Sequence, residues 1–243
     1  MHILEIKNLK KSFGGVHAVN GLDLAFARGK LTSVIGPNGS GKTTLVNVLS
    51  GVYAMDGGTV AVASATLRTI NPEDLPRLGI TRTFQDVRLF EQMTVLDNIL
   101  VTLTERHPWK ALFERTTSSH DAKAEAVLKK VGLWEKRTQL AYNLSYGQRK
   151  LLEIGRVLAM DAEIILLDEP FAGLFKEMIR IIVGIIQELK AAGKTVLLIE
   201  HNMDLIRELS DHVVVMDAGT LLAEGKPEEV LARRDVIEAY LGE

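Results

Sequence analysis

Apolar residues follow two different patterns along this chain, and each pattern predicts a different kind of strand. In the first 65 residues they alternate with polar ones, as at Leu22, Leu24 and Phe26 and again at Val60 and Val62. This alternation predicts an antiparallel β segment. The glycine pairs within the segment are predicted turns, at Gly14-Gly15 and Gly57-Gly58.

Three other runs are apolar or β-branched without interruption, which is typical of strands buried on both faces of a parallel sheet. They are Leu31–Ile35, Ile164–Leu167 and Thr195–Ile199. Helical patterns separate these runs, so the sequence predicts alternating strands and helices around a parallel sheet.

A helical insertion is predicted between the parallel strands. From Val95 to about Val157 the apolar spacing is mostly helical, including Ala122–Val131 and Gln148–Met160. Residues 104–121 are predicted to be a loop or insertion, and Lys226–Glu243 is predicted to be an ordinary helix. We therefore expect an α/β core with a helical subdomain inside it.

Composition narrows the class of protein. With 243 residues, 47% hydrophobic and 25% charged, the chain is long enough for one large α/β domain. A formal net charge of −2 offers no basic excess for a phosphate backbone, so nucleic acid is not expected as a partner. The absence of cysteine excludes disulfides, zinc–cysteine sites, iron–sulfur clusters and thiol catalysis.

Neither an export signal nor a membrane crossing is expected. Charges interrupt the first residues of the chain, where a signal peptide needs an apolar core. The most apolar stretch, Met178–Ile186, is broken by Arg180 and is far shorter than the about 20 apolar residues of a bilayer span.

A phosphate-binding loop is predicted at Gly36-Pro-Asn-Gly-Ser-Gly-Lys42-Thr43, which fits G-x-x-x-x-G-K-[ST]. The loop lies between the predicted strand Leu31–Ile35 and the helical run Thr44–Leu49, as phosphate binding requires. Backbone N–H groups would surround phosphate oxygens, Lys42 would reach the terminal phosphates, and the Thr43 hydroxyl would bind Mg²⁺. The alternative is a glycine-rich turn with a surface lysine.

Acidic and imidazole groups directly follow two of the predicted parallel strands. Asp168-Glu169 follows one strand and Glu200-His201 follows another, so all four side chains should converge on the edge that carries the phosphate loop. Asp168 could hold Mg²⁺ through water, Glu169 could polarise an attacking water, and His201 could hydrogen-bond the γ-phosphate. A single histidine at a strand end is often structural, but this convergence favours function. The histidines predicted to be surface groups are His2, His17, His107 and His120.

Leu144-Ser-Tyr-Gly-Gln148 precedes an amphipathic helix at Arg149–Met160. Ser145, with Gln148 three positions later, matches a capping box, which alone would explain both residues. The remaining N–H groups of such a helix end can also bind an anion, so capping and phosphate binding are compatible.

These motifs together resemble the ATP-binding subunit of ABC transporters, across essentially the whole chain. Gly36–Thr43 is similar to the Walker A loop, Gln85 in Thr83-Phe84-Gln85 to the Q-loop glutamine, and Leu144–Gln148 to the signature sequence. Ile164–Pro170 is similar to Walker B with its following glutamate, and His201 to the switch histidine. Five motifs in the family order are far more specific than any one of them.

The resemblance implies a fold, cofactors and site residues. The fold is a P-loop α/β ATPase with a mixed or parallel sheet core, an N-terminal antiparallel β subdomain and an inserted helical subdomain. It would be one domain over residues 1–243, with the core at about 1–90 and 160–243 and the helices at about 91–159. The implied cofactors are ATP and Mg²⁺. The implied catalytic residues are Glu169, His201 and Gln85, and the implied Mg²⁺ ligands are Thr43, Gln85 and Asp168. The implied ATP contacts are Phe13, Val19, Gly36, Pro37, Asn38, Gly39, Ser40, Gly41, Lys42, Thr43 and Thr44, with Ser145, Gly147 and Gln148 acting from the opposite subunit.

Phe13 would stack on adenine with Val19 beneath, although an aromatic side chain there could instead belong to a strand core. The resemblance also implies a head-to-tail dimer, either a homodimer or a heterodimer with a second ABC ATPase. The Gln85 region would transmit ATP-driven motion to integral membrane permeases, and an extracytoplasmic substrate-binding protein would take part indirectly. Such a subunit is cytoplasmic and peripheral on the inner face of the cell membrane.

A finer resemblance points to the ATPases of branched-chain amino acid importers. It is carried by Tyr146 in the signature sequence, and by Arg82–Phe90, Met93–Ile99, Ile199–Asp204 and Glu238–Glu243. Related importers of urea or other amides and a lipopolysaccharide-export ATPase remain alternatives.

One segment departs from the family pattern. After Ala172-Gly-Leu174 the family has Asn or Asp in the D-loop that contacts the opposite subunit, whereas this chain has Phe175 and Lys176. A phenylalanine cannot supply that polar contact, so we expect weakened coupling between the two sites of a homodimer.

Three other classes of function compete with a transport ATPase. An ABC ATPase acting on nucleic acid or ribosomes would usually have two cassettes, a coiled coil or zinc cysteines. An ATP-binding module that does not hydrolyse is disfavoured by Glu169 and His201, although Phe175 keeps it open. A GTPase or small-molecule kinase would not explain Leu144–Gln148.

Overall fold

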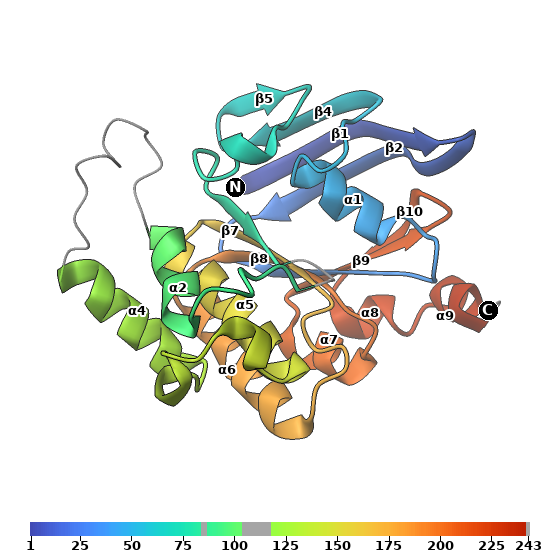
Figure 1. Cartoon of the computed structure of the whole chain (residues 1–243). Coiled ribbons are helices and arrows are strands. Elements are labelled where there is room, and N and C mark those ends of the chain that lie inside the picture. Colours follow the sequence, from blue (N-terminus) through green and yellow to red (C-terminus); the bar gives the residue numbers. More distant parts are fainter. Residues whose placement is uncertain (84–86, 104–117, 242–243) are drawn as a thin grey trace. The chain divides into compact units, whose positions relative to one another are not determined.

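The structure, a computed structural model, describes residues 1–83, 87–103 and 118–241. The chain divides into two compact units. Unit 1 comprises Met1–Arg82, Glu163–Glu169 and Ile186–Glu243, and unit 2 comprises Thr83–Ala162 and Pro170–Ile185. Both sheets belong to unit 1 (Figure 1).

The first sheet is antiparallel throughout, as the alternating pattern predicted, with the strand order β2-β1-β4-β5. Gly14 and Gly15 both have positive φ angles, of 51° and 88°, and form the predicted turn between β1 and β2. The strands are β1 (His2–Phe13), β2 (Val16–Ala27), β4 (Gly57–Val62) and β5 (Ala65–Leu67).

The second predicted glycine turn is wrong, because Gly57 and Gly58 lie inside β4. Gly58 has a φ of +89°, and a Cβ atom there would lie 2.4 Å from the carbonyl oxygen of Asn8. The facing strand changes register between Lys7 and Lys10. These glycines therefore mark an irregularity in strand pairing, the other common reason for glycine in a strand.

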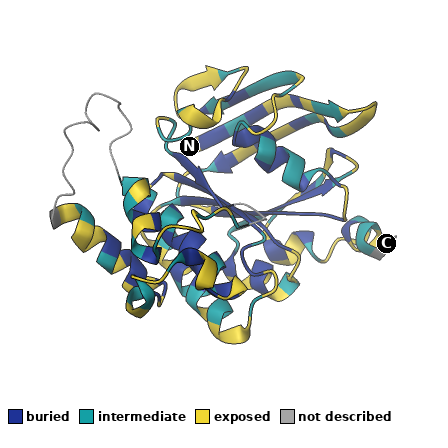
Figure 2. Ribbon diagram, in the orientation of Figure 1, coloured by how far each residue is buried: buried dark blue, intermediate teal, exposed yellow. Residues whose placement is uncertain are grey.

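The second sheet has six strands in the order β10-β9-β3-β8-β7-β6. It is mixed, because β10 pairs antiparallel with β9 and the other pairs are parallel. The three uninterrupted apolar runs form its central strands β3, β8 and β7, and every residue in them is buried (Figure 2). The strands are β3 (Leu31–Ile35), β6 (Ile80–Arg82), β7 (Ile164–Asp168), β8 (Thr195–Ile199), β9 (His212–Asp217) and β10 (Thr220–Gly225).

Helix α1 (Lys42–Leu49) lies between the two sheets of unit 1 (Figure 1). One apolar cluster joins Leu45 and Val48 of this helix to side chains from both sheets, including Leu4 and Leu166. A second cluster joins Val213 and Val215 of the mixed sheet to the helices on its other side. The remaining helical segments of unit 1 are η1 (Pro72–Asp74), α7 (Met203–Leu209), α8 (Pro227–Val230) and α9 (Arg234–Leu241).

The predicted single helix over Lys226–Glu243 is wrong, because α8 ends at Val230 and α9 begins at Arg234. Val230 and Val236 are both buried in the second cluster. They are six residues apart, and a continuous helix would place positions with that spacing on different faces. The break lets both side chains pack into one core.

Unit 2 is mainly helical. Helix α5 packs against α2 and α4, and the segment before α5 pairs with the segment before α2 through Thr94 and Leu140. Helix α4 begins at Ser118, so residues 118–121 are helical, contrary to the predicted loop over 104–121. The helical segments are α2 (Val95–Leu103), α4 (Ser118–Lys130), η2 (Trp134–Lys136), η3 (Ala141–Asn143), α5 (Tyr146–Met160) and α6 (Lys176–Ala191), of which α6 continues into unit 1 from Ile186. In the described part of the chain, no helix combines the length and the apolarity needed to span a bilayer.

Candidate functional site

The glycine-rich loop connects β3 to α1, as predicted, and two of its glycines are required by close backbone contacts. A Cβ atom on Gly36 would lie 2.0 Å from the carbonyl oxygen of Met216, and one on Gly41 would lie 2.2 Å from that of Ala18. Both glycines also have positive φ angles, of 147° and 101°. The loop therefore has a tightly packed path that side chains at these positions would disrupt.

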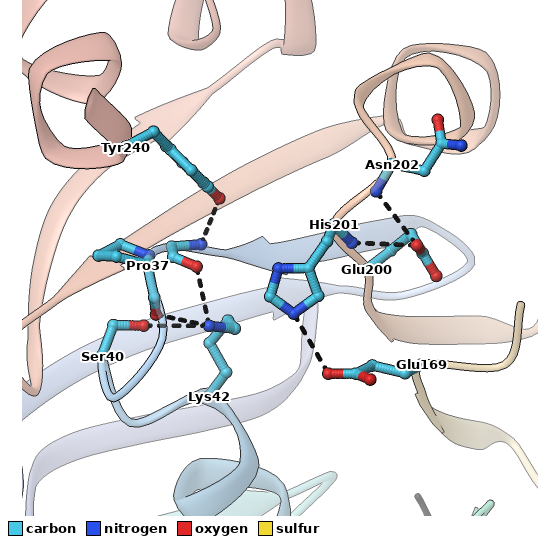
Figure 3. Close-up of polar contacts among 9 residues, drawn as sticks. Pro37, Ser40, Lys42, Glu169, Glu200, His201, Asn202 and Tyr240 are labelled. Carbon is cyan, nitrogen blue, oxygen red and sulfur yellow. Dashed lines mark hydrogen bonds and ion pairs between the residues drawn. The ribbon is translucent and has the colours of Figure 1, made fainter. Parts of the chain in front are cut away.

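Lys42 directs its ammonium group into this loop (Figure 3). Its Nζ donates to the carbonyl oxygens of Gly36 and Pro37, both at 2.8 Å, and lies 3.4 Å from the Ser40 hydroxyl. Lys42 is only 5% exposed. The alternative of a glycine-rich turn with a surface lysine is therefore wrong. The Lys42 ammonium group is a buried cation that the loop surrounds.

Tyr240 of α9 also contacts the loop, although none of the sequence motifs includes it. The Gly36 N–H donates to the Tyr240 hydroxyl at 2.7 Å (Figure 3). Residues 238–243 carry a family resemblance, but nothing local in them indicates a contact with a loop some 200 positions earlier. Only the packing of α9 brings the tyrosine there.

Glu169 and His201 meet at the carboxyl ends of adjacent strands, as the parallel pattern predicted. Strands β7 and β8 pair in register, with Asp168 opposite Ile199, so the residues that follow are neighbours. His201 Nε2 lies 3.2 Å from Glu169 Oε1 (Figure 3). Glu169 has a left-handed backbone with a φ of 48°, which is uncommon for a side chain larger than glycine.

Glu200 does not join this pair, contrary to the predicted convergence of all four side chains. Its carboxylate is buried and accepts the backbone N–H groups of His201 at 3.0 Å and of Asn202 at 3.1 Å (Figure 3). Its other oxygen, Oε2, has no hydrogen-bond partner among the described residues. Burial raises the pKa of this carboxyl, and the two N–H bonds partly oppose that shift. Glu200 holds the backbone that carries His201.

Asp168 is also buried, and its Oδ2 lies 3.5 Å from a guanidinium nitrogen of Arg82. Phe13 is 42% exposed, so it does not belong to a strand core. Its ring meets that of Tyr53 edge to face, with centroids 5.0 Å apart. Val19, in contrast, is fully buried in the core and offers a base no surface. A direct contact between Val19 and adenine is therefore not supported.

In unit 2, Ser145 caps α5 in the predicted capping box. The Ser145 hydroxyl accepts the Gln148 N–H at 3.4 Å, and the Gln148 side chain accepts the Ser145 N–H at 3.1 Å. Gly147 is buried, and a Cβ atom there would lie 2.2 Å from the sulfur of Met178. Packing within unit 2 thus also favours a glycine at this position.

The histidines predicted to be surface groups differ in their exposure. Gln85 and His107 lie outside the described residues. His2 and His17 are exposed, as predicted, whereas His120 is partly buried.

Comparison with known proteins gives the family. A model of the ABC transporter family matches residues 19–172, and one of the branched-chain amino acid ATP-binding cassette transporters matches residues 220–243. The high-affinity branched-chain amino acid transport ATP-binding protein LivG of Escherichia coli (strain K12) is 40% identical over 251 residues, covering 99% of this chain and 98% of LivG. BraF of Pseudomonas aeruginosa, described in the same words, has the same identity and coverage. A crystal structure of an ATP-binding cassette of an ABC transporter in its ADP conformation is 37% identical, with a TM-score of 0.86 over 100% of both chains. The chain therefore belongs to the ABC transporter family, in the group of branched-chain amino acid transport ATP-binding proteins.

Proposed function

We propose that this chain binds ATP with Mg²⁺, hydrolyses it, and thereby powers the import of branched-chain amino acids through separate membrane subunits. The observation that carries the proposal is the arrangement at one sheet edge. The loop holding Lys42 follows β3, while Glu169 and His201 follow its near neighbours β7 and β8. Ligands of parallel α/β sheets bind at this edge.

Phosphate oxygens would be bound by the backbone N–H groups of the 36–43 loop and by Lys42, whose charge already lies inside it. The site also fits a magnesium ion. Mg²⁺ in nucleotide sites uses one or two protein oxygens together with phosphate oxygens. The Thr43 hydroxyl, in the first turn of α1, and the buried Asp168 carboxylate are such donors. When bound, Mg²⁺ supplies charge neutralisation at the phosphate oxygens.

Glu169 would act as the general base. As water attacks the γ-phosphorus, the carboxylate accepts the water proton, and the products are ADP and phosphate. An ionised carboxylate only accepts hydrogen bonds, so the 3.2 Å contact requires the proton of His201 on Nε2. His201 thereby orients Glu169 towards the water. Gln85 is proposed as a further Mg²⁺ ligand on the strength of its motif alone.

A complete site would need a second cassette, either another copy of this chain or a related ATPase. Ser145, Gly147 and Gln148 of that second subunit would close over the nucleotide. Ser145 and the helix end that it caps, the N-terminus of α5, would face the nucleotide. Gly147 is buried and would contact the nucleotide through its backbone. The assembled pair would lie at the cytoplasmic face of the cell membrane and act on permeases supplied with substrate by an extracytoplasmic binding protein.

The hydrolysis step is tested by Glu169→Gln. We expect turnover to fall roughly 10²–10⁴-fold, as for the loss of a general base, with ATP binding retained. Glu163→Gln is a matched control, because Glu163 directly precedes the same strand and is exposed. Loss of ATP binding with unchanged turnover per bound ATP would show that Glu169 is not the base.

The transported substrate is tested separately, by reconstituting the chain with permeases and a binding protein of a branched-chain amino acid importer. Uptake of radiolabelled leucine that depends on ATP would support the proposed substrate. Uptake of urea or an amide instead, or export of a lipid, would assign the complex to a related transporter.

A further inference from the structure

Arg82 is a buried cation at the end of β6, and it lies close to Asp168 of the proposed magnesium site. The residue is 9% exposed, and its side chain 5%. A guanidinium group is costly to bury unless its N–H groups and its charge are matched. Its partners therefore indicate what it holds in place.

The two ends of the guanidinium bond to different elements. Nη1 donates to Asn47 Oδ1 of α1 at 2.8 Å and to the hydroxyl of Ser50, which follows the helix. The Ser50 hydroxyl donates to the Val46 carbonyl at 2.7 Å, so its lone pairs are available to Arg82. Nη2 lies 3.5 Å from Asp168 Oδ2 at the end of β7, a distance at which charge contributes more than hydrogen bonding.

The α1 partner Asn47 lies on the same helix face as Thr43, because it follows Thr43 by four residues. Ser50, the second partner, is the C-cap of the same helix. The face that carries the Thr43 hydroxyl is thus tied, through Arg82, to the strand end that carries Asp168.

We propose that Arg82 is a positioning residue that sets the separation of Thr43 and Asp168 and thereby the affinity of the site for the Mg²⁺–nucleotide complex. This inference rests on the proposed function, because it takes those two residues as the oxygen donors for the ion. Arg82 touches neither nucleotide nor metal in this role. It acts through α1 and β7.

The test compares ADP binding by isothermal titration calorimetry in excess Mg²⁺ and in excess EDTA, using the full chain. The ratio of the two dissociation constants for ADP measures how much Mg²⁺ contributes to ADP binding. We expect Arg82→Met to reduce that contribution roughly tenfold, which corresponds to about 1.4 kcal/mol, with binding in EDTA nearly unchanged. Arg82→Lys keeps the charge but cannot reach both elements, so it should recover only part of the loss. Arg28→Met, at an exposed ion pair of the same unit, is the control.

Two further variants keep the test decisive. Asn47→Ala removes a half-buried contact on α1 without leaving Asp168 unpaired, so it should fold and should also weaken the Mg²⁺ contribution. In an Asp168→Asn background, Arg82→Met should have little additional effect. The proposal is overturned if folded Arg82→Met keeps the wild-type ratio, or if Arg82→Met fails to fold and Asn47→Ala keeps that ratio. Absence of ADP binding by the wild-type chain under both conditions would instead reject the proposed function.

Discussion

At the scale of single residues, the site depends on side chains held by unusual backbone or by burial. Glu169 adopts a left-handed conformation, and its N–H donates to the Ile199 carbonyl of β8 at 3.1 Å. That conformation costs roughly 1–2 kcal/mol for a residue with a Cβ atom, so neighbouring strand contacts must stabilise it. Strain of this kind concentrates at functional sites, which agrees with the role proposed for Glu169.

Glu200 makes stability depend on pH in a definite direction. Burial raises its pKa above the ordinary value of 4.5, so the folded chain holds this proton more tightly than the unfolded chain. The stabilisation from this group is complete below pH 4.5 and is lost as the pH rises through the higher folded-state pKa. Glu200→Gln keeps an oxygen for the two N–H groups but cannot ionise. It should therefore be more stable than wild type at high pH, by a margin that shrinks as the pH falls.

Urea unfolding at a series of pH values from 4.5 upward measures this difference in the free energy of unfolding. Glu73→Gln, at an exposed position, serves as the control and should stay within about 0.5 kcal/mol of wild type throughout. A difference for Glu200→Gln that is independent of pH, or a loss of stability at high pH, would contradict the assignment.

At the scale of elements, capping determines where the helix of the signature sequence begins. The Ser145 side chain and the Gln148 side chain satisfy each other's backbone N–H groups at the start of α5. Helix α5 also packs against α2 and α4, so its N-terminus affects the stability of unit 2.

Ser145→Ala should lower the free energy of unfolding by about 0.5–2 kcal/mol, the usual cost of losing an N-cap. Denaturant unfolding without nucleotide measures this effect apart from any contact with ATP. Ser145→Asp supplies another good capping oxygen and should restore most of the stability. Equal stability of the alanine variant and the wild type would mean that the cap contributes nothing measurable.

At the scale of the whole molecule, Phe175 is the main departure from the family pattern. Phe175 is 76% exposed. Its backbone carbonyl accepts the N–H groups of Met178 and Ile179, at 3.0 and 3.1 Å, where α6 begins. An exposed aromatic side chain there cannot supply the polar contact that the family makes with the opposite subunit.

In a homodimer of this chain, Phe175→Asn should therefore increase the cooperativity of ATP hydrolysis, seen as a Hill coefficient that rises towards two, its upper limit for two sites. Phe175→Ala removes the ring without adding a polar group and should leave the coefficient near the wild-type value. Asparagine is also a good N-cap for α6, so unfolding must be measured alongside. An unchanged Hill coefficient in a folded Phe175→Asn variant would contradict the hypothesis that Phe175 weakens coupling between the two ATP sites.

Three strands of the six-stranded sheet and the phosphate loop could be predicted from local patterns. Continuous apolar runs identified β3, β7 and β8 to within a residue, because burial on both faces leaves no polar positions. The capping box of Ser145 and Gln148 could also be predicted from the sequence, because the two residues lie within one helical turn. The Gly57-Gly58 turn and the single C-terminal helix were wrong, because pairing with β1 and packing of Val230 with Val236 overrode the local signal.

Patterns along the chain were enough to predict the phosphate loop, the central strands and the meeting of Glu169 with His201. Each follows from short-range spacing or from the shared edge of parallel strands. Three contacts were visible only in the folded chain: Glu200 turns to its own backbone, Tyr240 reaches Gly36, and Arg82 joins α1 to Asp168. The residues that make these contacts lie in segments whose local sequence does not indicate the contact or already has another explanation. The partners of Tyr240 and Arg82 become neighbours only when the strands and helices of unit 1 pack, so no spacing rule along the chain could reveal them. Glu200 instead accepts from the next two residues, and its burial in the folded chain separates it from the Glu169–His201 pair.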